Sequence, residues 1–302
     1  MDQLRVLVPT PAASNAICRL AEREGLYAKH GLEAEVRVVG DSSALLREAR
    51  NGGACVFYLA AAAVVEAALD GAELVLFVGA VNRPFHSIVC HPEIASAEDL
   101  RGKRVGFIGR NDELSCRLAL SQLGLAMGRD VIGVRIVGPP EARLAALDDG
   151  SVEATVIAPP YTFRAKKAGF RELVSLADLD QEYQSGSCAT SREFVASQRD
   201  VVLRFTKALS EAIKLFKTDR DVALAALMAH TGGDPDEAEE SWRLFALRCM
   251  PEVPALTLSG LRFVMDNVVQ HPAVRQHEAE EFVDLSVVEQ LQDEGFYAEV
   301  WD

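Results

Sequence analysis

The sequence predicts an α/β protein with two lobes, each a mostly parallel sheet flanked by helices. Short segments rich in β-forming residues alternate with amphipathic helical segments, and this alternation restarts near residue 90. The chain is also long enough for two domains, at 302 residues. Its 49% hydrophobic and 25% charged content is that of a globular protein.

The first lobe starts with a strand and then alternates helices with strands. Ser42 and Ser43 suit the N-cap of its second helix. Because each helix has to carry the chain back across the sheet, the strands are predicted to be parallel. Strands are expected over Leu4–Val8, Ala34–Val39, Cys55–Tyr58 and Leu74–Val81, and helices over Asn15–Lys29, Ser42–Asn51 and Ala60–Leu69.

The second lobe repeats the alternation after an extended segment, Ser87–His91. Ser96 and Asp99 have the spacing of a helix N-terminus. The restart of the pattern marks a separate lobe. Strands are expected over Arg104–Ile108, Val131–Val137, Ala154–Ala158 and Leu173–Leu176, and helices over Glu113–Gly124, Glu141–Asp148 and Tyr161–Ala168.

From Glu193 onward the chain is predicted to be helical. Gly232 and Gly233 predict a helix end, and Asp234 and Pro235 suit the cap and first position of the next helix. The acidic tail is expected to return and cover a lobe. Amphipathic helices are expected over Phe194–Phe216, Asp221–Thr231, Asp234–Cys249 and Leu258–Asn267, and the tail is Gln276–Asp302.

The charge balance limits the classes of partner. With 31 Lys+Arg against 45 Asp+Glu, the formal net charge is −14, whereas nucleic acid or an anionic membrane requires a basic face. The most apolar stretch, Val56–Leu69, contains Glu66 and is too short to span a bilayer, so membrane insertion is not expected. No signal peptide is recognised, which leaves a cytosolic protein or a mature chain with a replacement start Met.

Cysteine usage and motif content argue against a metal, a cofactor or a disulfide framework. No cysteine belongs to a CxxC pair, and free thiols fit a reducing compartment better than an oxidising one. There is no P-loop, GxGxxG or GxSxG motif. Cys90 lies near His86 and His91, but strand packing explains this group better than a metal or catalytic site. The six cysteines are Cys18, Cys55, Cys90, Cys116, Cys188 and Cys249.

Three segments, taken in order and at this spacing, resemble one family. They are Ala21–Leu32, Ile94–Gly106 with its Asp-Leu-Arg-Gly-Lys-Arg-Val-Gly core, and Ala145–Ala154, which Pro159 and Pro160 follow. Together they resemble the type 2 periplasmic-binding fold. The likeness is to the branch that holds nitrate-, sulfonate- and taurine-binding proteins and thiamine-pyrimidine-precursor proteins. The same fold also carries enzymes, so the resemblance implies the fold more directly than the function.

The resemblance implies two lobes joined by a hinge. Lobe one would comprise residues 1–88, completed by a helical return over residues 188–302, and lobe two residues 89–187. The chain would cross near His86–His91 and near Tyr183–Cys188, and a hinge motion would enclose a ligand in the cleft. The implied partners are a small-molecule ligand and the permease of an ABC transporter, and the protein is expected to be a monomer.

Residues that follow the strands of lobe one are candidate ligand contacts, because ligands bind beyond the carboxyl ends of parallel strands. Each has a structural alternative: Ser14 would otherwise cap a helix, and Tyr58 and Phe85, which would sandwich a planar ligand, would otherwise pack in the core. Arg83 would bind a carboxylate or sulfonate, or lie in a solvated loop. Asp41 disfavours an anion beside the serine pair. The candidates are Pro11, Ala12, Ser14, Ser42, Ser43, Tyr58, Asn82, Arg83 and Phe85.

The loops of lobe two supply a second set of candidates: Arg110, Asn111, Glu113, Pro159 and Tyr161. Nitrate- and sulfonate-type relatives place small hydroxyl residues at the first of these loops. The charged set found here implies a larger ligand with both donor and acceptor groups. As alternatives, Asn111 or Asp112 caps the helix and Tyr161 packs on its own first turn.

Solute capture without covalent chemistry is the first functional hypothesis. The protein would bind a small organic ligand, acidic or heteroaromatic, for ABC-type transport, with Arg83 or Arg110 holding an acidic group. Pro11 and its neighbours stand where the sulfinate desulfinase of this fold has a nucleophilic cysteine, so no catalytic residue is predicted. Two alternatives stay open: a cytosolic enzyme acting on a small aromatic or heteroaromatic acid, and a cytosolic ligand sensor.

Overall fold

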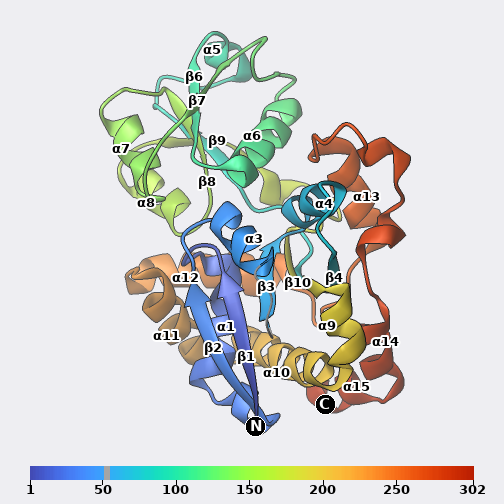
Figure 1. Ribbon diagram of the computed structural model, residues 1–302. Coiled ribbons are helices and arrows are strands. Elements are labelled where there is room, and N and C mark those ends of the chain that lie inside the picture. Colours follow the sequence, from blue (N-terminus) through green and yellow to red (C-terminus); the bar gives the residue numbers. More distant parts are fainter. Residues whose placement is uncertain (51–54) are drawn as a thin grey trace. The chain divides into compact units, whose positions relative to one another are not determined.

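The computed structural model describes residues 1–50 and 55–302, in two compact units (Figure 1). Unit 1 comprises Met1–Arg83 and Gln181–Asp302, and unit 2 comprises Pro84–Asp180. The chain therefore passes between the units twice, at 83/84 and at 180/181. The boundaries expected from the sequence were 88/89 and 187/188.

Unit 1 is built on a five-stranded sheet with the order β2-β1-β3-β10-β4 (Figure 1). β1 is parallel to β2 and β3, whereas β10 is antiparallel to both β3 and β4. Four strands thus run one way and one runs the other, which confirms a mostly parallel sheet. The strands are β1 (Asp2–Val8), β2 (Leu32–Val38), β3 (Cys55–Ala60), β4 (Leu74–Val81) and β10 (Gly186–Ser191).

The strand β10 is the main element that the sequence analysis missed. Its residues are Gly186-Ser187-Cys188-Ala189-Thr190-Ser191, and the first five are buried between β3 and β4. Small residues carry neither the alternation nor the bulk that marks a strand in a sequence. They suit the centre of this sheet because bulky neighbours on β3 and β4 fill the space on either side.

The helices that connect the strands of unit 1 differ from prediction in one place. The helix expected over Asn15–Lys29 divides into a short 3-10 turn, η1 (Ala13–Asn15), then α1 (Ala16–Arg23) and α2 (Leu26–Lys29). Gly25 has φ +68, a left-handed conformation that ends α1 and that residues with a side chain adopt at a cost. The other two connections are α3 (Ser42–Arg50) and α4 (Ala61–Leu69).

The helical part of the chain packs onto unit 1. Phe205 of α10 is fully buried, with its ring centroid 5.8 Å from that of Tyr27 and 6.1 Å from that of Phe77. The helix expected over Phe194–Phe216 divides at Gln198, and the one expected over Asp234–Cys249 ends in a π-helical turn, Phe245–Cys249. These elements are α9 (Arg192–Ser197), α10 (Arg199–Thr218), α11 (Arg220–Thr231), α12 (Pro235–Leu244) and α13 (Leu258–Asn267).

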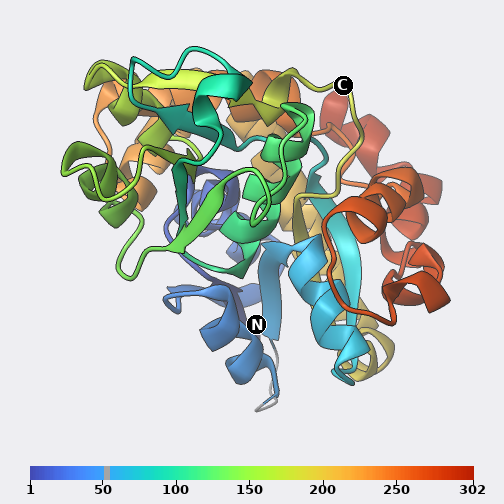
Figure 2. The same cartoon turned by 90° about the horizontal axis from the view of Figure 1, so that it is seen from above.

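The acidic tail covers unit 1, as the sequence predicted. Val283 bridges Leu76 on the edge strand β4, and the Asp284 amide donates to the Leu76 carbonyl over 2.7 Å. Figure 2 shows this C-terminal segment, in red, beside α4 and β4. Two short helices then end the chain, α14 (Ser286–Asp293) and α15 (Phe296–Trp301). The tail thereby covers a strand edge that would otherwise leave its backbone unpaired.

Unit 2 repeats the sheet plan of unit 1, with the order β7-β6-β8-β5-β9. β6 is parallel to β7 and β8, and β5 is antiparallel to β8 and β9. Each sheet therefore holds its reversed strand in fourth place. The elements are β5 (Ser87–Cys90), α5 (Ala97–Leu100), β6 (Arg104–Phe107), α6 (Arg110–Gln122), β7 (Ile132–Arg135), α7 (Ala142–Asp148), β8 (Ala154–Ile157), α8 (Tyr161–Lys167) and β9 (Arg171–Ser175).

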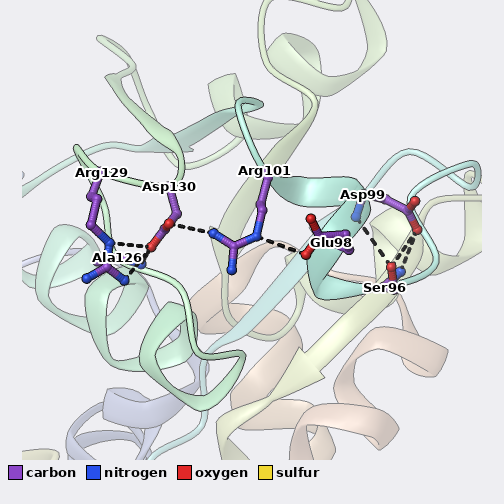
Figure 3. Close-up of polar contacts among 7 residues, drawn as sticks. All are labelled: Ser96, Glu98, Asp99, Arg101, Ala126, Arg129 and Asp130. Carbon is purple, nitrogen blue, oxygen red and sulfur yellow. Dashed lines mark hydrogen bonds and ion pairs between the residues drawn. The ribbon is translucent and has the colours of Figure 1, made fainter.

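The motif that opens the second lobe has a structural role (Figure 3). Ser96 caps α5 in a reciprocal capping box with Asp99, which confirms the predicted helix start. The Asp130 carboxylate accepts hydrogen bonds from Arg101 over 2.5 Å and from Arg129 over 2.7 Å. Arg129 above all, with the Ala126 amide, lowers the pKa of Asp130 to about 2. These contacts tie the segment before β6 to the segment before β7.

Within the described ranges 1–50 and 55–302, no helix is both long enough and apolar enough to cross a bilayer.

Candidate functional site

The loop after β1 is held against the sheet by Tyr58. The Tyr58 hydroxyl donates to the carbonyl of Ser14 over 2.6 Å, and both residues are buried. Gly186 of β10 lies directly beneath that hydroxyl, where a Cβ atom would collide with it. With Tyr58 only 3% exposed, its ring lies in the core, which favours the packing alternative over a sandwich with a ligand.

Ser14 does not cap a helix, contrary to the structural alternative. Neither η1 nor α1 has a side-chain cap; their N-cap positions are Ala12 and Asn15. The Ser14 hydroxyl makes no hydrogen bond to any residue within the described ranges. Pro11 and Ala12 are half-buried beside it. The loop after β1 therefore holds, at the carboxyl edge of the sheet, a buried hydroxyl without a protein partner in those ranges.

The loop after β2 uses a different cap from the predicted one. The Asp41 carboxylate accepts a hydrogen bond from the Ala44 amide over 2.7 Å. Asp41 is therefore the cap of α3, and Ser42 and Ser43 lie in its first turn. A carboxylate satisfies the same amides better than a hydroxyl at this position, since it also suits the helix dipole.

Asn82 belongs to a buried amide network that the sequence analysis missed. The amide nitrogen of Gln184 donates to the Asn82 side-chain oxygen over 3.0 Å and to the Ser187 hydroxyl over 3.1 Å. Asn82 in turn donates to the Ala255 carbonyl over 2.9 Å. Gln184 is 1% exposed and nothing in its sequence neighbourhood marks it. The network joins the segment that leaves unit 1 near Asn82 to the segment that returns to it near Gln184. The Asn82 side chain is therefore used in hydrogen bonds within unit 1.

Arg83 and Phe85 fall on opposite sides of the unit boundary. Arg83 is half-buried and is the last residue of the first segment of unit 1. Phe85 is 8% exposed in unit 2 and stacks on His86, with ring centroids 4.6 Å apart and an interplanar angle of 21°. Phe85 and Tyr58 therefore lie in different units.

A buried arginine organises the carboxyl edge of the unit 2 sheet. Arg143, in the first turn of α7, is 6% exposed. Its guanidinium donates to the Asp112 carboxylate over 2.5 Å, and over 3.2 Å to the carbonyls of both Pro140 and Val156. The helix expected over Glu141–Asp148 contained Arg143, but the sequence analysis did not single it out. An arginine on the apolar side of a predicted helix is the one signal that could have found it.

Tyr161 and His86 complete this cluster. The Tyr161 hydroxyl donates to Glu141 over 2.7 Å, and the guanidinium carbons of Arg143 and Arg164 lie 5.7 and 5.0 Å from its ring centroid. Burial, with the Glu141 contact, raises the pKa of Tyr161. Burial and then the charge of Arg143 lower the pKa of His86 to about 4, although Asp112 opposes this. His86 is therefore neutral at pH 7.

The remaining candidates of unit 2 are Glu113, Arg110, Asn111 and Pro159. Glu113 accepts from Arg117, one turn further along α6, over 2.8 Å. Asp112 accepts from the Ile108 amide over 3.4 Å, which makes it the residue that reaches back over the helix start. The side chains of Arg110 and Asn111 lie outside the described part of the structure. Pro159 is half-buried and joined to Pro160 by a cis peptide bond.

The profile of the family described as NMT1/THI5 like matches residues 14–223, more than half of the chain. The chain belongs to the NMT1/THI5-like family.

One relative of this NMT1/THI5-like chain is a protein of Brucella abortus (strain 2308) that is provisionally named a binding protein. It is 26% identical over 204 residues, which cover 65% of this chain and 61% of the relative. The chain thus spans about three-fifths of the length of this relative.

Two solved structures share the fold. The alkanesulfonate-binding protein SsuA from Xanthomonas axonopodis pv. citri, bound to MOPS, is 20% identical with a TM-score of 0.76, covering 94% of this chain and 99% of that one. A ligand-binding component of an ABC-type import system from Staphylococcus aureus is 14% identical with a TM-score of 0.79, covering 96% and 99%. At these identities the likeness confirms the type 2 periplasmic-binding fold alone.

The cysteines of this family member are all buried and free. Burial raises the pKa of Cys18, Cys55 and Cys249 to about 12, so these thiols stay protonated at neutral pH. Cys90 donates to the carbonyls of Ile94 and Arg171, and the His91 ring packs edge-on against Phe170 at 5.4 Å. Among the described residues, no group of three or more His, Cys, Asp or Glu is arranged to hold a metal.

We expect the native protein to resist thiol reagents. Titration with Ellman's reagent at pH 8 should detect almost no reactive thiol in the folded protein and all six after unfolding without reductant. The physical reason is burial, which both blocks the reagent and holds the thiols protonated. One thiol that reacts rapidly in the native state, or fewer than six after unfolding, would contradict this prediction.

Proposed function

We propose that this chain is the substrate-binding component of an ABC-type importer and binds a small organic ligand without transforming it. The observation that carries the proposal is the repeated sheet plan, in which polar loops follow the parallel strands of both units. Ligands of open α/β sheets bind at such carboxyl edges. Two ligand-binding proteins of known structure that share the fold support this assignment, as does the family.

The proposed ligand is acidic or heteroaromatic. In unit 1 the candidate contacts are the loops that hold Ser14 and Arg83. Unit 2, taken by itself, has candidates in the cluster around Arg143. Arginine can bind a carboxylate or sulfonate with two parallel hydrogen bonds. The proposal retains Arg83 and Arg110 as candidates for the acidic group. Asn82 and Tyr58 would support the site from behind, since their polar groups already form hydrogen bonds within unit 1.

A ligand should stabilise the protein and be recovered unchanged. We expect one member of a panel of sulfonates, carboxylates and aminopyrimidines, MOPS and taurine included, to raise the free energy of unfolding. At a ligand concentration one hundredfold above its Kd the gain is about 2.7 kcal/mol. Urea denaturation with and without each compound measures the gain, and chromatography after a long incubation measures recovery.

The outcomes of that experiment separate the alternatives. Recovery of a converted product would reject pure binding and favour an enzyme acting on a small aromatic or heteroaromatic acid. A ligand sensor would be favoured by a compound that stabilises the protein and is not converted, if a strain lacking the protein still imports that compound normally. Absence of any stabilisation across the panel would contradict the proposed ligand class.

A further inference from the structure

We propose that His230 and Asn15 are positioning residues that hold the loop Thr10–Asn15 in its ligand-binding conformation. The inference rests on the proposed function for the purpose of the loop, but the positioning itself is a property of unit 1. His230 lies in the last turn of α11, 215 residues from Asn15 in the sequence. No local sequence pattern links the two.

The two side chains meet inside the protein. The His230 Nε2 atom lies 2.5 Å from the Asn15 side-chain oxygen, and the two residues are 8% and 2% exposed. On its other side, the Asn15 amide nitrogen donates to the carbonyl of Thr10 over 3.0 Å. Asn15 thus spans the loop from its last residue to its first, and His230 holds Asn15.

The hydrogen bonds determine the tautomer of His230. Because the Asn15 amide nitrogen donates to Thr10, its oxygen faces the ring, so Nε2 must carry the proton and donate. Burial, with the charge of Arg19, lowers the pKa of His230 to about 4, so the ring is neutral at pH 7. A neutral histidine with one defined donor orients an amide without placing a charge beside the loop.

The loop is thereby held at two points. Tyr58 holds the Ser14 carbonyl from the sheet, and His230 holds Asn15 from α11. The Ser14 hydroxyl has no partner among the described residues. A buried polar pair adds little net stability compared with an apolar pair of the same shape, whereas it specifies orientation. Orientation of the loop is therefore the role that the pair fulfils.

Hydrogen exchange tests the positioning without any ligand. The amides of Ala12 and Asn15 are hydrogen-bonded within the loop and report on its order. In His230→Leu we expect these amides to exchange about tenfold faster or more, while amides of α10 keep their wild-type rates. His230→Gln, whose amide can donate to Asn15, is the matched control and should restore most of the protection.

The outcomes are separable. If loop amides exchange at the wild-type rate in His230→Leu, or if α10 amides speed up equally, the proposal is overturned, because the effect is absent or global. If His230→Leu does not fold, Asn15→Ala removes the same bond from the other side, and unchanged exchange of the Ala12 amide there also overturns it. Failure of the ligand panel would contradict the proposed ligand class and leave this result intact.

Discussion

Replacing Arg143 with methionine should lower the free energy of unfolding by about 3–5 kcal/mol, the usual cost of breaking a buried ion pair. The substitution leaves the Asp112 carboxylate without its cation and removes the donor to the carbonyls of Pro140 and Val156. Methionine fills much of the volume but supplies no hydrogen bond. Urea denaturation of the purified variant at pH 7 measures the change.

Two further variants make the Arg143 prediction specific. Arg129→Gln breaks an ion pair whose arginine side chain is 72% exposed, and should cost less than about 1 kcal/mol. The double variant Asp112→Leu with Arg143→Met removes both charges and should recover a large part of the loss. Equal losses in the free energy of unfolding for Arg143→Met and Arg129→Gln would show that the buried ion pair stabilises the protein no more than the exposed one.

Gly79→Ala should be the second strongly destabilising substitution, by about 1–3 kcal/mol, because it overpacks the centre of β4. A methyl group there would lie 2.7 Å from the Ala255 carbonyl oxygen and 2.8 Å from the amide nitrogen of Gln184. The first contact is with backbone, so a change of rotamer cannot relieve it. The contact with Gln184 disturbs the amide network in which Gln184 binds Asn82.

Gly109→Ala is the control for Gly79→Ala. Apart from the chain neighbours of Gly109, no atom of the described residues lies within 4 Å of a methyl group there, and its φ of −119 is open to any residue. Only the N-cap preference of α6 changes, at a cost below about 1 kcal/mol. Urea denaturation measures both variants, and a Gly79→Ala protein as stable as Gly109→Ala would refute the overpacking argument.

Local signals in the sequence predicted most of the elements. Asp234 accepts from the Glu237 amide over 2.9 Å with Pro235 at the first helical position, as the sequence indicated. The capping box at Ser96 and Asp99 was equally predictable. In each case the residues that define the structure are neighbours in the chain, so their spacing alone carries the information.

The candidate site was less predictable because its decisive contacts join distant residues. Ser14 and Asp41 were correctly placed in loops after strands, but which of them would cap a helix depended on backbone geometry. Arg143, Gln184 and His230 were not among the predicted site residues. All three are buried polar residues, and their partners lie 31, 102 and 215 positions away. No spacing rule reaches across such separations.

The sequence by itself determined the α/β class, the two lobes and the helix starts, since periodicity and capping act within a few residues. Tertiary structure alone decided that Gly186-Ser187-Cys188 would run antiparallel between β3 and β4, and that Tyr58 would be buried above Gly186. It also decided that His230 would face Asn15. The reason is physical: a small or polar residue is buried only where other parts of the chain supply its packing and hydrogen bonds, and those parts come together only on folding.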